Sequence, residues 1–263
     1  MWSHAEVLAP LRQRFEERGH DVHVPTLPGH DPEDPWEPEQ IGNTSITEYF
    51  EFLTGYIRSL QLNSPPVLVG HSMGGLLAQM IASAHETGPV VLFNSAGPAG
   101  VNHINPTAAR ATLNVLTTPF FWKKPHKPSY SRACYGLLNQ MEPHLSEEVY
   151  SQLVPESGRA MFELVFWFLD RKKVTRIDTD RIKAPILILH GERDRITPTS
   201  VARALQRLYP GAEVHSYADH GHWICHEPFA TNTIDRLIDW IETHANSRST
   251  RISDDTGALP GRV

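Results

Sequence analysis

The chain has 263 residues, a formal charge of −6 at pH 7 and a hydrophobic share of 40%. This length fits one large α/β domain or two small ones, and the composition excludes a coiled coil and a chain that is disordered throughout. The mild negative charge provides no basic surface for nucleic acid. Because no apolar run reaches the roughly 18 residues of a membrane span, we expect a globular protein without nucleic-acid binding or stable membrane insertion.

The cysteines and the first residues indicate the compartment. Cys134 and Cys225 are the only two cysteines and lie far apart, so they do not form a disulfide framework. Residues 1–6 lack the charged and apolar regions of a secretory signal peptide. We therefore expect a cytoplasmic location, where thiols stay reduced.

Hydrophobic spacing predicts helices and strands that alternate along most of the chain. Amphipathic patterns indicate helices, and short apolar runs indicate strands that are buried on both faces. This alternation predicts an α/β fold, a mostly parallel sheet with flanking helices. The expected helices cover about residues 4–18, 49–60, 74–84, 199–209 and 229–244, and the expected strands cover about 22–27, 67–69, 90–93, 186–189 and 212–217.

Two segments break this alternation. Residues 98–184 are helical in pattern and rich in aromatic side chains, which predicts a helical cap inserted into a core made of residues 1–97 and 185–245. Residues 246–263 contain almost no apolar side chains, and we expect them to form a disordered tail.

The sharpest motif is Gly70-His71-Ser72-Met73-Gly74-Gly75, which lies between an expected strand and an expected helix. A Gly-x-Ser-x-Gly pattern in that context places the serine on a tight turn, with its hydroxyl exposed at the carboxyl edge of the sheet. A plain glycine-rich turn is the alternative interpretation. If Ser72 is a nucleophile, its hydroxyl needs a base to accept the proton, and the base needs an acid to orient it.

Suitable partners follow two later strands. Asp194 comes directly after the strand expected at 186–189, and His222 follows the strand expected at 212–217. Because the carboxyl ends of parallel strands meet at one sheet edge, both side chains are expected near Ser72. A loop aspartate that begins a turn before Pro198 is the alternative for Asp194.

These motifs resemble the α/β-hydrolase superfamily over roughly residues 4–244. The resemblance rests on the serine turn, on Asp194 and His222 in that order, and on three flanking motifs: Leu27-Pro28-Gly29-His30, Gly191 with Pro198, and Glu227-Pro228. It implies that Ser72 is the nucleophile, His222 the general base and acid, and Asp194 the orienting carboxylate. It also implies that the backbone N–H of Met73 is one oxyanion donor.

Other histidines are weaker candidates. His220 competes with His222 as the base, but Gly221 directly before His222 and Glu227-Pro228 after it fit the family pattern better. The cluster His215, His220, His222 and His226 lacks the spacing of a known zinc motif. We therefore expect neither a metal nor a cofactor.

The chain departs from the family at its start. Members carry a central strand that ends in His-Gly, and the loop after this strand supplies the second oxyanion donor. The resemblance implies that about 25–35 residues of this region are absent before Met1. Either the start of the chain is assigned too late, or the chain lacks a central strand and one donor, which costs about 10²–10³ in turnover. A third alternative is that the strand expected at 22–27 closes up beside the strand at 67–69.

The sequence therefore predicts a serine hydrolase that cleaves a small or medium carboxylic ester through an acyl-enzyme on Ser72. Its partner would be a small ester-like substrate. Thioester, lactone or C–C hydrolysis and acyl transfer can use the same triad. A catalytically impaired binding protein is the alternative from another class. The sequence carries no signal for the oligomeric state.

Overall fold

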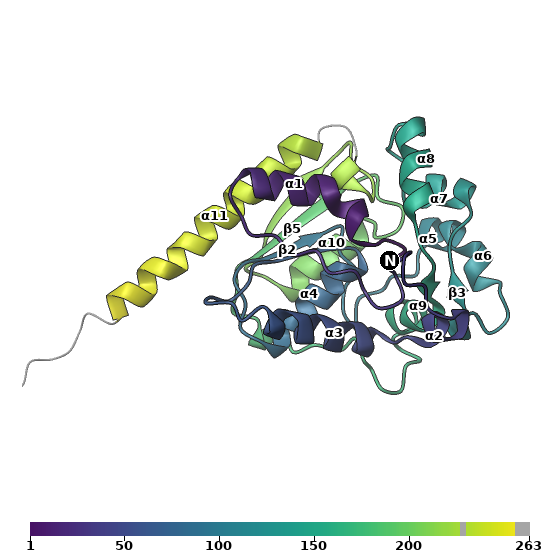
Figure 1. The fold of residues 1–263 in the computed structure, drawn as a ribbon, viewed down its shortest axis with the longest axis horizontal. Coiled ribbons are helices and arrows are strands. Elements are labelled where there is room, and N and C mark those ends of the chain that lie inside the picture. The colour runs from purple at the N-terminus through teal and green to yellow at the C-terminus, as the bar shows by residue number, and fades with distance from the viewer. Residues whose placement is uncertain (227–229, 256–263) are drawn as a thin grey trace, which may run out of the picture.

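The fold is built on a parallel four-stranded sheet with the order β1-β2-β5-β6 (Figure 1). The computed structural model describes residues 1–226 and 230–255. Leu68 pairs with Val90, and Val90 pairs with Ile186, so the edge strand β1 and the two central strands begin at the same level. The predicted α/β class with a mostly parallel sheet is confirmed. The strands are β1 (Leu68–His71), β2 (Val90–Phe93), β5 (Ile186–Gly191) and β6 (Glu213–Tyr217).

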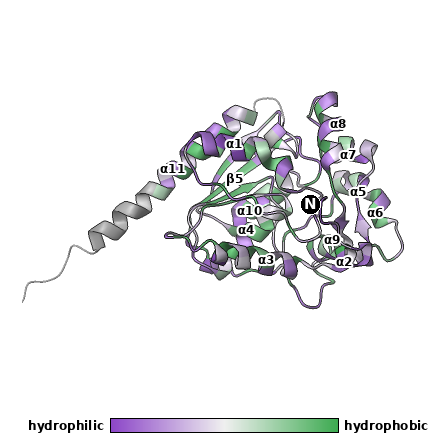
Figure 2. Cartoon of the chain, in the orientation of Figure 1, coloured by the Kyte–Doolittle hydropathy of each residue, from purple (hydrophilic) through white to green (hydrophobic). Residues whose placement is uncertain are grey.

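Helices cover both faces of this sheet. Val91 and Phe93 of β2 pack with residues of α1 (Ala9–Glu17) and α11 (Ala230–Asp255). Val90 and Leu92, which point the other way, pack with residues of α4 (Met73–Ala84) and α10 (Thr199–Leu208). The central strands are therefore apolar on both faces, as Figure 2 shows for β5. Helix α3 (Ile46–Ser59) packs on α4, and the short elements η1 (Ala5–Leu8) and α2 (Pro38–Asn43) precede it.

The residues between β2 and β5 gather beside the sheet (Figure 1). Helices are their main regular structure, as the pattern of 98–184 predicts, but they also contain a two-stranded antiparallel sheet, β3 with β4, that the sequence did not indicate. Their role as a cap stays a prediction. The elements are α5 (Pro106–Ala111), α6 (Leu113–Leu116), η2 (Phe121–Lys123), β3 (Pro125–His126), α7 (Tyr130–Gly136), α8 (Pro143–Gln152), β4 (Glu156–Ser157), α9 (Gly158–Val165) and η3 (Thr179–Arg181).

Two expectations about the ends of the chain need correction. The segment expected as a strand at 22–27 joins no sheet, so it does not close up beside β1. The tail expected to be disordered from residue 246 is instead part of α11 as far as Asp255, and this helix extends away from the body (Figure 1). The rest of that tail, 256–263, and the pair Glu227-Pro228 lie outside the described residues. No helix among the described residues is long and apolar enough to cross a membrane.

Candidate active site

Ser72 occupies the sharp turn between β1 and α4. Its backbone has φ 54° and ψ −122°, a conformation that side-chain-bearing residues rarely adopt. The turn is nevertheless fixed, because the Ser72 N–H donates to Phe93 O at 3.1 Å and the Ser72 carbonyl accepts from Gly75 and Ala96. The predicted strand-turn-helix geometry is therefore present around Ser72.

Two glycines make this turn possible. A Cβ on Gly70 would lie 2.6 Å from the Cα of Gly75, and a Cβ on Gly75 would lie 2.6 Å from the Cβ of Ser95. The backbone of β1 at Gly70 therefore lies against the backbone of the first turn of α4, and the Ser95 side chain lies against Gly75. The same turn leaves the N–H of Met73 at the start of a helix, where no intrahelical acceptor is available. The sequence predicts this N–H to be an oxyanion donor, and that role stays a prediction.

Asp194 and His222, the other two predicted site residues, are in direct contact. His222 Nδ1 lies 2.8 Å from Asp194 Oδ2, and both side chains are almost completely buried. The Asp194 carboxylate also accepts from the N–H of Ile196 and Thr197 and from the hydroxyl of Thr197, at 2.7–2.9 Å. Such a carboxylate can hold the His222 ring in one tautomer and orientation.

The surroundings of Asp194 stabilise the ionised form of its carboxyl group. Burial by itself raises the pKa of Asp194, but the His222 imidazole, the Thr197 hydroxyl and the Ile196 N–H outweigh it, so the pKa lies below its usual value. Asp194 is therefore an anion at neutral pH and accepts the Nδ1–H of His222. The opposite ring nitrogen, Nε2, is then the one available to a substrate or to a serine hydroxyl.

Asn94 links the end of β5 to the loop that carries His222, and sequence reasoning missed this residue. Its Nδ2 donates to the carbonyls of Gly221 and His222 at 2.7 and 3.0 Å, and its Oδ1 accepts from the N–H of Gly191. Its own carbonyl oxygen lies 2.9 Å from Thr197 Oγ1, whose one hydroxyl hydrogen is shared between this oxygen and Asp194 Oδ2. The available signal was a polar side chain directly after the apolar run 90–93, at the sheet edge where the other site residues lie.

His71 connects the serine turn to the His222 loop. Its Nε2–H donates to the carbonyl of His222 at 2.7 Å, and the centres of the two rings are 4.8 Å apart. Burial and the neighbouring His222 lower the pKa of His71 to about 3, so this ring is neutral at physiological pH. Among the described residues no hydrogen bond joins Ser72 Oγ to His222, a contact that often forms only with substrate bound.

The competing histidine has a different environment. His220 Nε2 lies 3.1 Å from Thr233 Oγ1, and its ring stacks on Tyr217. The geometry thus favours His222 over His220 as the partner of Asp194. The described part of the chain contains no group of three or more histidine, cysteine, aspartate or glutamate side chains placed to hold a metal ion.

Comparison with known proteins identifies the family. The family model described as "Alpha/beta hydrolase family" matches residues 1–233. The chain belongs to the alpha/beta hydrolase family. It is similar to the AB hydrolase superfamily protein YisY of Bacillus subtilis (strain 168), with 28% identity over 65% of this chain and 64% of that protein. It is also similar to the mouse (Mus musculus) sn-1-specific diacylglycerol lipase ABHD11, with 27% identity over 61% of this chain and 54% of the lipase.

The chain thus spans less than two thirds of the length of these two relatives. Solved alpha/beta hydrolase structures support the fold over more of the chain. A monoacylglycerol lipase from Paleococcus ferrophilus superposes with a TM-score of 0.68 and 23% identity, covering 93% of this chain and 91% of the lipase. The methylesterase MES16 from Arabidopsis gives a TM-score of 0.71 with 14% identity, covering 92% and 95%.

Proposed function

We propose that this alpha/beta hydrolase is a serine hydrolase that cleaves a small or medium carboxylic ester. The observation that carries the proposal is the placement of Ser72 on a strained turn at the same sheet edge as the buried Asp194–His222 pair. The names of the monoacylglycerol lipase and the methylesterase, which share this fold, agree with ester chemistry. Fold alone does not choose the substrate.

The proposed reaction has two steps. Ser72 Oγ attacks the ester carbonyl carbon while His222 Nε2 accepts the serine proton, and the imidazolium then gives that proton to the departing alcohol. A water molecule next loses a proton to His222 and attacks the acyl-enzyme, which releases the acid and returns the proton to Ser72. Asp194 stabilises the imidazolium in both steps, and the Met73 N–H stabilises the oxyanion.

Labelling with a fluorophosphonate probe, followed by ester hydrolysis, tests this proposal. Wild-type protein should be labelled on Ser72 and should hydrolyse members of a panel of esters with graded acyl length. Ser72→Ala should lose both activities, and Ser151→Ala, at an exposed serine, should keep both. Ester turnover that survives in Ser72→Ala would contradict the assignment. A folded wild-type chain that no probe labels would favour the binding-protein alternative.

A further inference from the structure

The side chain of Gln79 lies inside the protein, behind the serine turn. Gln79 belongs to α4 and is completely buried. Its Nε2 donates to the carbonyls of Gly75 and Ala96 at 3.0 and 2.9 Å. The same nitrogen lies 3.1 Å from Ser95 Oγ. Because carbonyl oxygens only accept hydrogen bonds, these contacts fix the orientation of the amide. One side chain therefore joins the first turn of α4 to the segment after β2.

The two residues whose carbonyls bond Gln79 also hold the backbone of Ser72. The Ser72 carbonyl accepts from the N–H of Gly75 at 3.0 Å and from the N–H of Ala96 at 2.9 Å. Since Ser72 has the strained φ of 54°, these two hydrogen bonds oppose its return to an ordinary backbone conformation. Gln79 thus bonds one side of both residues, and Ser72 bonds the other side.

Tyr209 orients the far end of the Gln79 amide. Tyr209 directly follows α10 and is buried, and its hydroxyl donates to Gln79 Oε1 at 2.9 Å. Burial raises the pKa of Tyr209, so the hydroxyl keeps its proton at physiological pH. A chain of hydrogen bonds therefore extends from Tyr209 through Gln79 to the two residues that bond Ser72.

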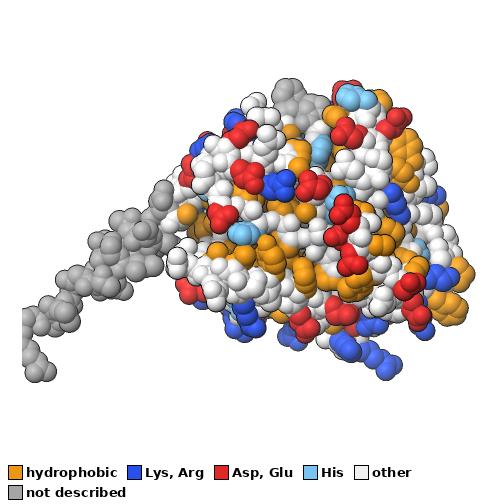
Figure 3. Space-filling view, in the orientation of Figure 1, with side chains coloured by type: hydrophobic (Ala, Val, Ile, Leu, Met, Phe, Trp, Pro, Cys, Tyr) orange, Lys and Arg blue, Asp and Glu red, His pale blue; other side chains and the backbone are white. Residues whose placement is uncertain are grey.

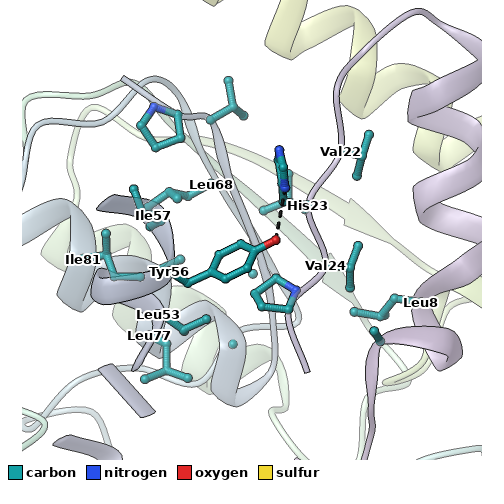
Figure 4. A pocket seen from close by; sticks show the side chains of 18 of the residues that line it. Leu8, Val22, His23, Val24, Leu53, Tyr56, Ile57, Leu68, Leu77 and Ile81 are labelled. Carbon is teal, nitrogen blue, oxygen red and sulfur yellow. Dashed lines mark hydrogen bonds between the residues drawn. The ribbon is translucent and has the colours of Figure 1, made fainter. Parts of the chain in front are cut away.

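Helix α4 is otherwise almost entirely apolar. Gln79 and Ser83 are its only polar side chains, and Leu77 and Ile81 point into a cavity that α3 also lines (Figure 4). Charged side chains of both signs spread over the surface seen in Figure 3, whereas α4 is buried almost throughout. A buried amide costs free energy unless it is hydrogen-bonded, and an apolar side chain would fill the same space without that cost. The amide of Gln79 is therefore explained by the bonds that it makes to the serine turn.

We propose, on the basis of the serine hydrolase function proposed above, that Gln79 is a positioning residue. Through Gly75 and Ala96 it holds Ser72 in the conformation that directs Oγ toward the substrate carbonyl. A nucleophile displaced by about 1 Å loses about 10²-fold in rate, so disorder of this turn lowers turnover more than substrate binding. Gln79 itself touches no reacting atom and acts only through the backbone of the turn.

Gln79→Met tests this role, because methionine has a similar shape and makes none of the four side-chain hydrogen bonds. Ester kcat and the rate at which the fluorophosphonate probe labels Ser72 should fall about 10-fold or more, with KM within about 2-fold of the wild type. The Ala96 amide should exchange its hydrogen about 10-fold faster, since its bond to the Ser72 carbonyl is no longer held in place. Circular dichroism shows whether the variant is folded.

Ser83→Ala is the matched control. Ser83 lies one turn further along α4, and its hydroxyl bonds the backbone C=O and N–H of Asp178 at 2.9 and 3.2 Å. This variant also removes a buried polar group from the same helix, but the group is not connected to the serine turn. It should leave kcat, labelling and Ala96 exchange within about 2-fold of the wild type.

Tyr209→Phe is a second and milder test. It removes only the hydroxyl that bonds Gln79 Oε1 and should lower kcat and labelling about 3-fold. When it is combined with Gln79→Met it should have no further effect on either rate, because Tyr209 acts through Gln79. If Gln79→Met does not fold, Tyr209→Phe decides the question by the same measurements.

Two results would overturn the proposal. One is a Gln79→Met variant that loses stability in urea but matches Ser83→Ala in kcat, labelling and Ala96 exchange, because Gln79 would then only pack the core. The other is a raised KM with unchanged kcat, which would indicate a role in substrate binding. A folded wild-type chain that is neither labelled nor active contradicts the serine hydrolase function instead, and Ala96 exchange in Gln79→Met then decides by itself whether Gln79 holds the turn.

Discussion

Replacing Asn94 with alanine tests whether this side chain holds the candidate site together. Asn94 is 1% exposed and makes three side-chain hydrogen bonds, one from the N–H of Gly191 and two to the carbonyls of Gly221 and His222. Its backbone also has φ 41°, a left-handed conformation that asparagine tolerates better than alanine does. The substitution therefore removes hydrogen bonds and adds backbone strain.

The magnitude follows from these contacts. Burying the Gly191 N–H without its acceptor costs about 1–3 kcal/mol, and each of the two donated hydrogen bonds is worth about 1 kcal/mol. The His222 carbonyl still accepts from His71, so it does not lose its last partner. The left-handed backbone adds about 1 kcal/mol for alanine. We expect Asn94→Ala to lower the free energy of unfolding by about 4–6 kcal/mol in total.

Urea unfolding, extrapolated linearly to water, measures this loss. Asn139→Ala is the matched control, because Asn139 also bonds the loop after β5, donating to Arg193 O, but the side chain is half-buried and this hydrogen bond is exposed to solvent. We expect that variant to lose less than about 1 kcal/mol. An Asn94→Ala variant that loses no more than Asn139→Ala would refute the reasoning, because the buried hydrogen bonds would then not stabilise the site.

Three further predictions concern charge and packing. Asp194→Asn should lower ester turnover about 10⁴-fold, because the amide favours the wrong tautomer of the histidine; Asp219→Asn, at an exposed ion pair, should not. Burial raises the pKa of Glu156, but His30, the amino terminus and Tyr49 outweigh it and lower this pKa to about 2. Its ionised form therefore stabilises the fold above the usual glutamate pKa, and this stabilisation is lost as the pH falls toward 2. Glu156→Gln should cost about 3 kcal/mol in urea unfolding at pH 7, and an equal stability of Glu156→Gln and the exposed control Glu147→Gln would contradict this. Gly75→Ala should cost about 1–3 kcal/mol, because its Cβ would overlap Ser95. Gly55→Ala, in open space on α3, should instead raise thermal stability, and the reverse order of the two melting temperatures would show that the close approach is unimportant.

The sequence was informative where a motif coincides with a change of element. Gly70 and Gly75 around Ser72 predicted a turn where backbones approach closely, and the structure shows that approach. Asp194 and His222 were expected at one sheet edge because both follow strands, and they lie within hydrogen-bond distance. In these places a local pattern was sufficient, since parallel topology brings the ends of strands together whatever lies between them.

Sequence reasoning failed where a side chain acts through distant partners. The residues that Asn94 bonds lie 97–128 positions away along the chain, and no local pattern announces them. The strand expected at 22–27 failed for a related reason. Alternating apolar residues favour a strand, but a strand needs a neighbour for its hydrogen bonds, and Val22–Val24 has none among the described residues.

The position of β1 divides the candidate site into two parts that are held differently. Asp194 and His222 are held through Asn94, which follows β2, a strand with neighbours on both sides. Ser72 follows β1, which pairs with β2 alone among the described strands. Strands with few buried contacts open more readily than central ones. The Asp194–His222 pair is therefore held from the interior of the sheet, whereas the serine turn follows an edge strand of the described sheet and depends more on its own backbone hydrogen bonds.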